Sequence, residues 1–178
     1  MQTREGPVTT IEWLTTSTGV RYGYVYYHHT VRKRYRAALG TIRCIDDGFW
    51  RPYKLELRDF LKYLLGRLGT DNLDPFVFAG GGLVISSPEM PSDRDFVLRN
   101  IGISRRHHGT KLLKIYNHHD CAFAGGFARF NNDLRAEFEF HCRELFHAAH
   151  IVREAFPDLE IRLHFIDCEG VIRIEEPK

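Results

Sequence analysis

The chain has 178 residues, 43% of them hydrophobic, and its 25 basic side chains nearly balance its 23 acidic ones. This length can bury one sizeable core but is short for two ordinary domains, so we expect a single domain over residues 1–178. The formal net charge of +2, without a basic tail, gives no reason to expect a nucleic-acid partner.

The N-terminal residues MQTREGPVTT lack the charged start, apolar stretch and cleavage site of a secretory signal, and no apolar run is long enough to span a bilayer. We therefore expect a cytoplasmic protein with no membrane partner. In a reducing compartment, cysteines bind metals or lie buried more often than they form disulfides. The chain has four: Cys44, Cys121, Cys142 and Cys168.

The first part of the chain predicts two paired strands. Residues 8–14 and 20–27 are rich in β-branched and aromatic side chains and are separated by Thr-Ser-Thr-Gly, which predicts a hairpin. The basic run at 32–36 is interpreted as a solvated face, because no further basic cluster with interleaved aromatics accompanies it.

The middle of the chain alternates predicted strands and helices. Residues 37–45 predict a buried strand that ends in a polar turn, and 55–68 predict an amphipathic helix that stops at Gly69. Residues 75–79 predict a second strand, which continues into Gly80-Gly81-Gly82 and Leu83-Val84-Ile85. The glycines predict a loop where backbone approaches something closely, and their spacing fits no nucleotide-binding motif.

The second half predicts further elements of the same kind. We expect a helix from Ser92 or Asp93 to about His108 and a strand over 111–117. A long helix should follow the capping stretch 131–133 and end at Pro157, and two paired strands should close the chain. The apolar stripe of the long helix comprises Phe138, Cys142, Leu145, Ala149, Val152 and Phe156. The pattern predicts an α/β fold with a central, mostly parallel sheet flanked by helices.

Two predicted strands end at residues that can bind a metal. Cys44 closes the first of them, and the turn after the third contains His118 and Cys121, three residues apart. Zinc prefers thiolate and imidazole ligands, and a catalytic site supplies three protein ligands and one open position. Because ligands bind at the carboxyl ends of parallel strands, these residues could converge there. On spacing alone, either cysteine could equally be a small buried hydrophobe.

These motifs resemble the β-carbonic anhydrase family, which carries Cys-x-Asp-x-Arg after its first core strand, a glycine loop after the second and His-x-x-Cys after the third. The matching segments are CIDDGF from Cys44, FAGGG from Phe78 and HHDCA from His118. The resemblance covers about 37–175, which leaves 1–36 as an N-terminal extension. It implies that Cys44, His118 and Cys121 bind zinc, with Asp46 beside the metal. It also implies a homodimer or higher homo-oligomer.

The sequence departs from the family pattern at two positions. Gly48 stands where the family has an arginine that holds the aspartate away from zinc, and Arg51 or Arg43 are the candidates to replace it. Without that partner, Asp46 could itself occupy the fourth coordination position. Ala122 replaces a glycine, which is the milder change.

The resemblance implies a lyase that hydrates carbon dioxide to bicarbonate, because zinc lowers the pKa of bound water toward about 7 and makes hydroxide available. His119 could carry the released proton, or it could be a solvent-exposed bystander. Two alternatives remain open: a non-catalytic zinc protein of the same fold, which the missing arginine favours, and a hydrolase of a related molecule such as carbon disulfide or carbonyl sulfide.

Overall fold

The structure is a computed structural model that describes residues 37–46 and 73–176, together with four two-residue strands near the N-terminus. The chain forms two compact units, Met1–Arg34 and Tyr35–Lys178. In the first unit, β2 (Leu14–Thr15) pairs antiparallel with β3 (Arg21–Tyr22), and β1 (Gly6–Pro7) pairs antiparallel with β4 (Tyr26–Tyr27). This antiparallel pairing agrees with the predicted hairpin.

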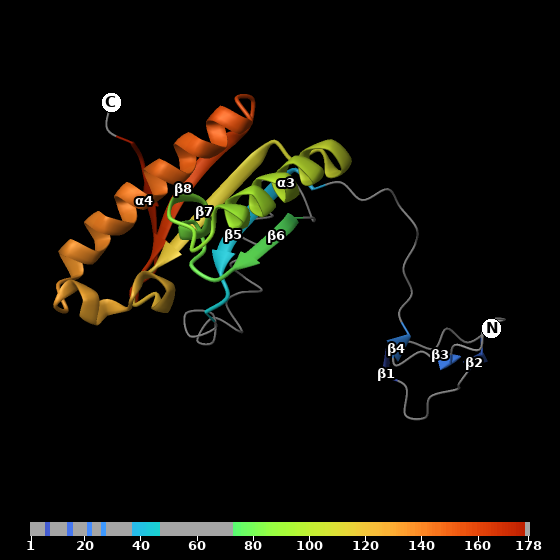
Figure 1. The fold of residues 1–178 in the computed structure, drawn as a ribbon, viewed down its shortest axis with the longest axis horizontal. Helices are drawn as coiled ribbons and strands as arrows, with labels where there is room; N and C mark the ends of the chain where they lie inside the picture. Colours follow the sequence, from blue (N-terminus) through green and yellow to red (C-terminus); the bar gives the residue numbers. More distant parts are fainter. Residues whose placement is uncertain are drawn as a thin grey trace. The chain divides into compact units, whose positions relative to one another are not determined.

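The second unit is built on a five-stranded sheet in the order β6-β5-β7-β8-β9 (Figure 1). The first four strands are parallel to one another and the last is antiparallel. The strands are β5 (Leu39–Cys44), β6 (Leu73–Phe78), β7 (Leu112–His118), β8 (Glu160–Ile166) and β9 (Val171–Ile174). The predicted α/β fold with a parallel centre is therefore confirmed.

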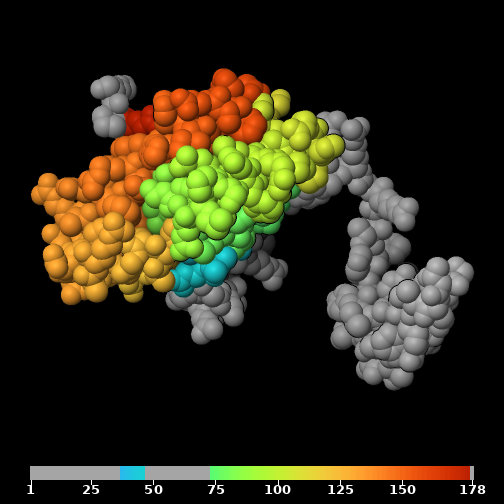
Figure 2. Space-filling model, in the orientation of Figure 1, coloured from blue at the N-terminus to red at the C-terminus, as the bar shows by residue number. Residues whose placement is uncertain are grey.

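Three helices pack on one face of this sheet: α2 (Leu83–Ser86), α3 (Pro91–His108) and α4 (Leu134–Ala155). They share one apolar core with side chains from β5, β7 and β8, and in Figure 2 they largely hide the sheet beneath them. Two short 3-10 helices, η2 (Ala122–Ala124) and η3 (Phe127–Phe130), connect β7 to α4. Within the described ranges, no helix is both long enough and apolar enough to cross a membrane.

The long helix α4 begins and ends where its sequence predicts. The carboxylate of Asp133 accepts hydrogen bonds from the backbone N–H groups of Arg135 and Ala136, and the helix stops two residues before Pro157. Its buried face is rotated from the predicted apolar stripe. Cys142 is only half-buried, whereas Glu137 and His141 are fully buried, because this face also meets the polar loop that follows β7.

Other boundaries differ in detail from the predictions. Helix α3 begins at Pro91 rather than after Ser92, and Asp93 contributes from inside the first turn by accepting the backbone N–H of Met90. The single turn of helix α2 was not predicted, because three apolar residues and a serine after a glycine loop carry no helical period. The predicted helix at 55–68 and the basic run at 32–36 lie outside the described residues.

The glycine loop between β6 and α2 approaches the backbone of two strands, as predicted. Gly81 has a positive φ of 58°, and a Cβ atom there would lie 2.4 Å from the carbonyl oxygen of Tyr116 and 3.1 Å from the nitrogen of Cys44. Only glycine fits this position, since both neighbouring atoms belong to the backbone and cannot rotate away. The loop therefore rests directly against the ends of β5 and β7.

We expect Gly81→Ala to destabilise the fold by about 1–3 kcal/mol or more, because the new Cβ meets backbone and adopts a left-handed conformation. The free energy of unfolding in urea, followed by circular dichroism, measures this loss. Gly170→Ala is the matched control, since a Cβ atom added at Gly170 would have no neighbouring atom within 4 Å, and its change should stay within about 0.5 kcal/mol. Equal stability of the two variants would contradict the close approach at Gly81.

Candidate metal centre

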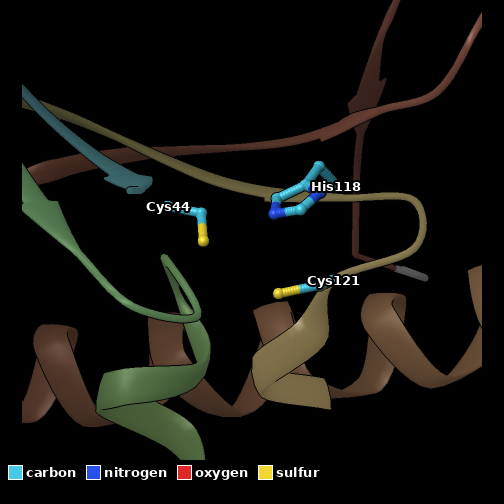
Figure 3. A group of neighbouring side chains, drawn as sticks. All are labelled: Cys44, His118 and Cys121. Carbon is cyan, nitrogen blue, oxygen red and sulfur yellow. The ribbon is translucent and has the colours of Figure 1, made fainter. Parts of the chain in front are cut away.

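The structure brings together the three residues that the sequence predicts as metal ligands. Cys44 is the last residue of β5, His118 is the last residue of β7, and Cys121 follows the turn after β7. Their ligand atoms all lie within 4.8 Å of one another, and all three residues are buried. Figure 3 shows both sulfur atoms and one imidazole nitrogen pointing into the same space. This group could hold a metal ion.

The surroundings of Cys44 favour its thiolate. Its Sγ accepts backbone N–H groups from Asp46 at 3.4 Å and from Gly80 at 3.3 Å, so the strand end and the glycine loop both donate to it. The hydrogen bond from Cys121 is the largest influence, and together with those from His118 and the two N–H groups it holds the pKa of Cys44 well below its usual value despite burial. The same hydrogen bond, with burial, raises the pKa of Cys121.

The ring of His118 is held in a defined orientation. Its Nδ1 lies 2.7 Å from the carbonyl oxygen of His119 and donates to it in the tautomer that leaves Nε2 as the lone-pair nitrogen. Burial alone would lower the pKa of His118, but the hydrogen bonds to Cys44 and to the His119 carbonyl, with the negative charges of Cys44 and Asp46, raise it. The ring thus offers Nε2 as its ligand atom.

The acidic residues near these ligands occupy different positions. Asp46 is half-buried just beyond β5, and its carboxylate lies outside the group of three ligand atoms. Gly48 and Arg51 lie outside the described residues, whereas Arg43 is half-buried on β5. Asp120 is exposed, and its carboxylate accepts the backbone N–H of Phe127, so it stabilises the loop between β7 and η3.

His119 is paired with an acid instead of standing free in solvent. Its Nδ1 lies 2.5 Å from a carboxylate oxygen of Glu137, and its ring packs against Phe127 with centroids 4.6 Å apart. Glu137 is 1% exposed, and its second oxygen accepts the backbone N–H of Asp120. The alternative of a solvent-exposed bystander is therefore wrong for the position of His119, although its role in proton transfer remains a prediction.

Sequence reasoning missed Glu137 and His141, two buried polar residues of α4 beside the centre. His141 is 0% exposed, packs against Phe130, Phe140 and Phe165, and has no hydrogen-bond partner in the described parts of the chain. Burial lowers the pKa of His141 to about 3, and the nearby charge of His118 adds to this effect. The only available signal was their spacing of four residues, which places them on one helix face.

An apolar cavity of about 400 Å³ adjoins the ligand-bearing segments. It is lined by Ile45, which follows the candidate ligand Cys44, and by Phe123, which packs over Gly80 in the glycine loop. Strand β6 contributes Phe78 and helix α3 contributes Phe96. Glu89 and Asp93 are the acidic residues of its lining. The cavity could therefore admit a small uncharged molecule.

A family of proteins described as putative carbonic anhydrases matches residues 36–175. The chain belongs to this family. The match begins three residues before the first strand of the sheet and spans all three candidate ligands. The resemblance to carbonic anhydrases inferred from the motifs is thereby confirmed. No match was found among curated proteins.

Solved carbonic anhydrase structures are also similar to this chain. The enzyme from Streptococcus mutans has 15% identity and a TM-score of 0.49, covering 83% of this chain and 89% of its own. The enzyme from Glaciozyma antarctica has 12% identity and a TM-score of 0.46, covering 79% and 84%. The β-carbonic anhydrase CafA of Aspergillus fumigatus has 16% identity and a TM-score of 0.44, covering 80% and 78%.

We expect the purified protein to bind about one zinc ion per chain, and Cys44→Ser, Cys121→Ser and His118→Ala each to lose most of it, because each removes one of three ligands. Elemental analysis of dialysed protein measures the content. Cys168→Ser is the matched control, since this cysteine is exposed in the β8–β9 turn.

His119→Ala tests the register of the ligands and should keep its metal. Zinc at the wild-type level in both Cys44→Ser and Cys121→Ser would refute the assignment. Loss of zinc in His119→Ala together with retention in His118→Ala would show that the ligand is the neighbouring histidine.

Proposed function

We propose that this protein is a zinc-dependent carbonic anhydrase that reversibly hydrates carbon dioxide to bicarbonate. The observation that carries the proposal is the buried group of Cys44, His118 and Cys121, whose ligand atoms lie within 4.8 Å of one another in a chain of the carbonic anhydrase family. Two sulfurs and one imidazole leave a fourth tetrahedral position open, which is the pattern of a catalytic rather than a structural zinc site.

The donor atoms fit zinc in their chemistry as well as their spacing. Zinc ligands must be deprotonated, and the low pKa of Cys44 shows an environment that already favours one thiolate. The N–H groups of Asp46 and Gly80 orient that sulfur, and the His119 carbonyl orients the His118 ring. Bound zinc would supply Lewis-acid chemistry that lowers the pKa of water toward about 7, so that hydroxide is available near neutral pH.

The chain's own residues would position the substrate and move the proton. Carbon dioxide is small and uncharged, so the apolar cavity beside Ile45 and Phe123 is suited to hold it next to the centre. Hydration releases a proton, and the imidazole of His119 is suited to accept it. Glu137 holds that ring in place through its contact with Nδ1.

A second candidate is a non-catalytic zinc protein of the same fold, and Gly48 is the observation that favours it. Without an arginine at that position, the Asp46 carboxylate could bind the metal and close the site. A hydrolase of carbon disulfide or carbonyl sulfide would use the same ligands, since a fold does not determine its substrate.

We further propose a cytoplasmic location and a homodimer or higher homo-oligomer. All four cysteines are free thiols, which fits a reducing compartment. Among the described strands β6 is at the edge of the sheet, and an edge strand can pair with another chain. Light scattering that gives a mass of 20.8 kDa at micromolar concentration would refute the oligomer.

We expect zinc-loaded protein to hydrate carbon dioxide in a stopped-flow assay between about pH 7 and 9, a range chosen around the pKa of zinc-activated water. If Asp46 competes for the open position, the rate should be low at neutral pH and rise with pH, because hydroxide then competes better. If another arginine holds Asp46 away, the rate should already be substantial near pH 7.

Asp46→Asn separates the enzyme from the structural alternative. Full zinc content with a reduced rate would show that the carboxylate acts in catalysis. Glu139→Gln is a control carboxylate change on exposed helix surface and should leave the rate unchanged. Wild-type protein with full zinc and no hydration across the whole pH range would refute the enzyme and support the non-catalytic zinc protein.

A further inference from the structure

The face of the sheet opposite α3 and α4 carries an unusual group of buried polar side chains on its central strands. Lys114 and Tyr116 belong to β7, His164 to β8, and all three are at least nine-tenths buried. The pairing register places Lys114 directly beside Arg162, and Tyr116 directly beside His164. Since directly paired residues point to the same face, these side chains share one surface of the sheet.

Lys114 is a buried cation without a compensating acid. It is 7% exposed, and no carboxylate among the described residues forms an ion pair with it. Its charged neighbours are Arg162 and Arg173, and the pKa of Lys114 is lowered first by burial and then by these two positive charges. The arginines themselves pair with Glu160 and Glu175 at the exposed rim. A buried charge without a partner destabilises the folded state, so a negatively charged group bound next to Lys114 would stabilise it.

The next pair of residues along the two strands, Tyr116 and His164, adds polar groups that have no hydrogen-bond partner in the described ranges. The ring of Tyr116 stacks on that of His164, with centroids 4.7 Å apart and planes at 19°. The Tyr116 hydroxyl and His164 Nδ1 are buried and have no hydrogen-bond partner in the described ranges. Native proteins leave few such groups, and those that remain usually meet a water or an ion. Here two of them lie next to an unpaired lysine.

We propose that this face binds an oxyanion between Lys114, Tyr116 and His164. The ammonium group supplies the charge and up to three N–H donors, the phenol supplies an O–H, and the imidazole supplies an N–H in the tautomer protonated at Nδ1. Donors from two rows of the sheet suit an ion with several acceptor oxygens, such as a phosphate or a carboxylate. Arg162 and Arg173 extend the positive potential to the rim and attract the anion toward the buried lysine.

The site is separate from the metal centre and does not depend on the proposed function. Lys114 and His118 lie four residues apart on β7, which is roughly 13 Å along a strand. An anion that instead bound the metal centre would depend on Cys44 and not on Lys114. Variants at these two positions therefore tell the two sites apart.

Isothermal titration calorimetry of the full chain, with inorganic phosphate and separately with acetate against a chloride background of equal ionic strength, tests the proposal. We expect at least one of the two to bind, and Lys114→Met to weaken that binding about tenfold or more, since it removes a charged hydrogen-bond donor. Tyr116→Phe should also weaken it and should fold normally, because the hydroxyl it removes has no partner among the described residues. Lys111→Met, an equal charge change at an exposed position before β7, should bind like wild type.

Binding of phosphate alone would assign a phosphate group, binding of acetate alone a carboxylate, and binding of both an oxyanion of either kind. Cys44→Ser should retain this binding. The proposal is overturned if neither anion binds wild-type protein, or if Lys114→Met and Tyr116→Phe both bind as tightly as wild type. It is equally overturned if binding disappears in Cys44→Ser while Lys114→Met leaves it intact.

Discussion

The parallel pairing of β5 with β7 is the constraint on which the candidate centre depends. Parallel strands end at the same edge of a sheet, so the pairing that runs from Leu39 with Leu112 to Ile42 with Ile115 brings Cys44 and His118 to one place. A slip of one residue in this register would turn one strand's side chains to the other face. The buried side chains of Ile42, Leu113 and Ile115 fix the register, because they fill the core beneath α3 and α4.

The glycine loop completes the candidate centre by connecting the ends of the two paired strands. Its backbone fits between the ends of β5 and β7, where Gly80 donates to the Cys44 sulfur and Gly82 donates to the carbonyl of Tyr116 and to the side chain of Asn117. The loop therefore joins both ligand-bearing strands through hydrogen bonds that a side chain would block. These hydrogen bonds connect the glycine loop to the Cys44 sulfur and to the ends of β5 and β7. A metal bound there would therefore stabilise the same contacts that hold the strand ends together.

Much of this arrangement could be predicted from the sequence, because local patterns and a family resemblance point the same way. The period of α4, the cap at Asp133 and the strand patterns of β5 and β7 indicate the fold. The convergence of parallel strand ends allows Cys44, His118 and Cys121 to meet, and the resemblance to β-carbonic anhydrases implies that they are the metal ligands. Glu137 and His141 could not be found in this way, since charged and polar residues on a helix ordinarily face solvent. Their burial depends on the loop after β7, whose path is set by Asp120 and Gly126 rather than by any sequence period.

The two faces of β7 show how one strand serves two kinds of chemistry. All seven of its residues are buried, and alternation points Leu113, Ile115 and Asn117 toward the helices and Leu112, Lys114 and Tyr116 toward the other face, while His118 ends the strand at the candidate metal centre. Tyr116 lies between Lys114 and His118: its carbonyl accepts the N–H of Gly82 in the loop beside the candidate ligands, and its ring stacks on His164 beside Lys114. A displacement of β7 at Tyr116 would therefore reach both places, whereas the charge of Lys114 acts on the centre only across roughly 13 Å of strand. The position of β7, rather than a direct charge interaction, is therefore the stronger physical link between the face that carries Lys114 and the candidate ligands.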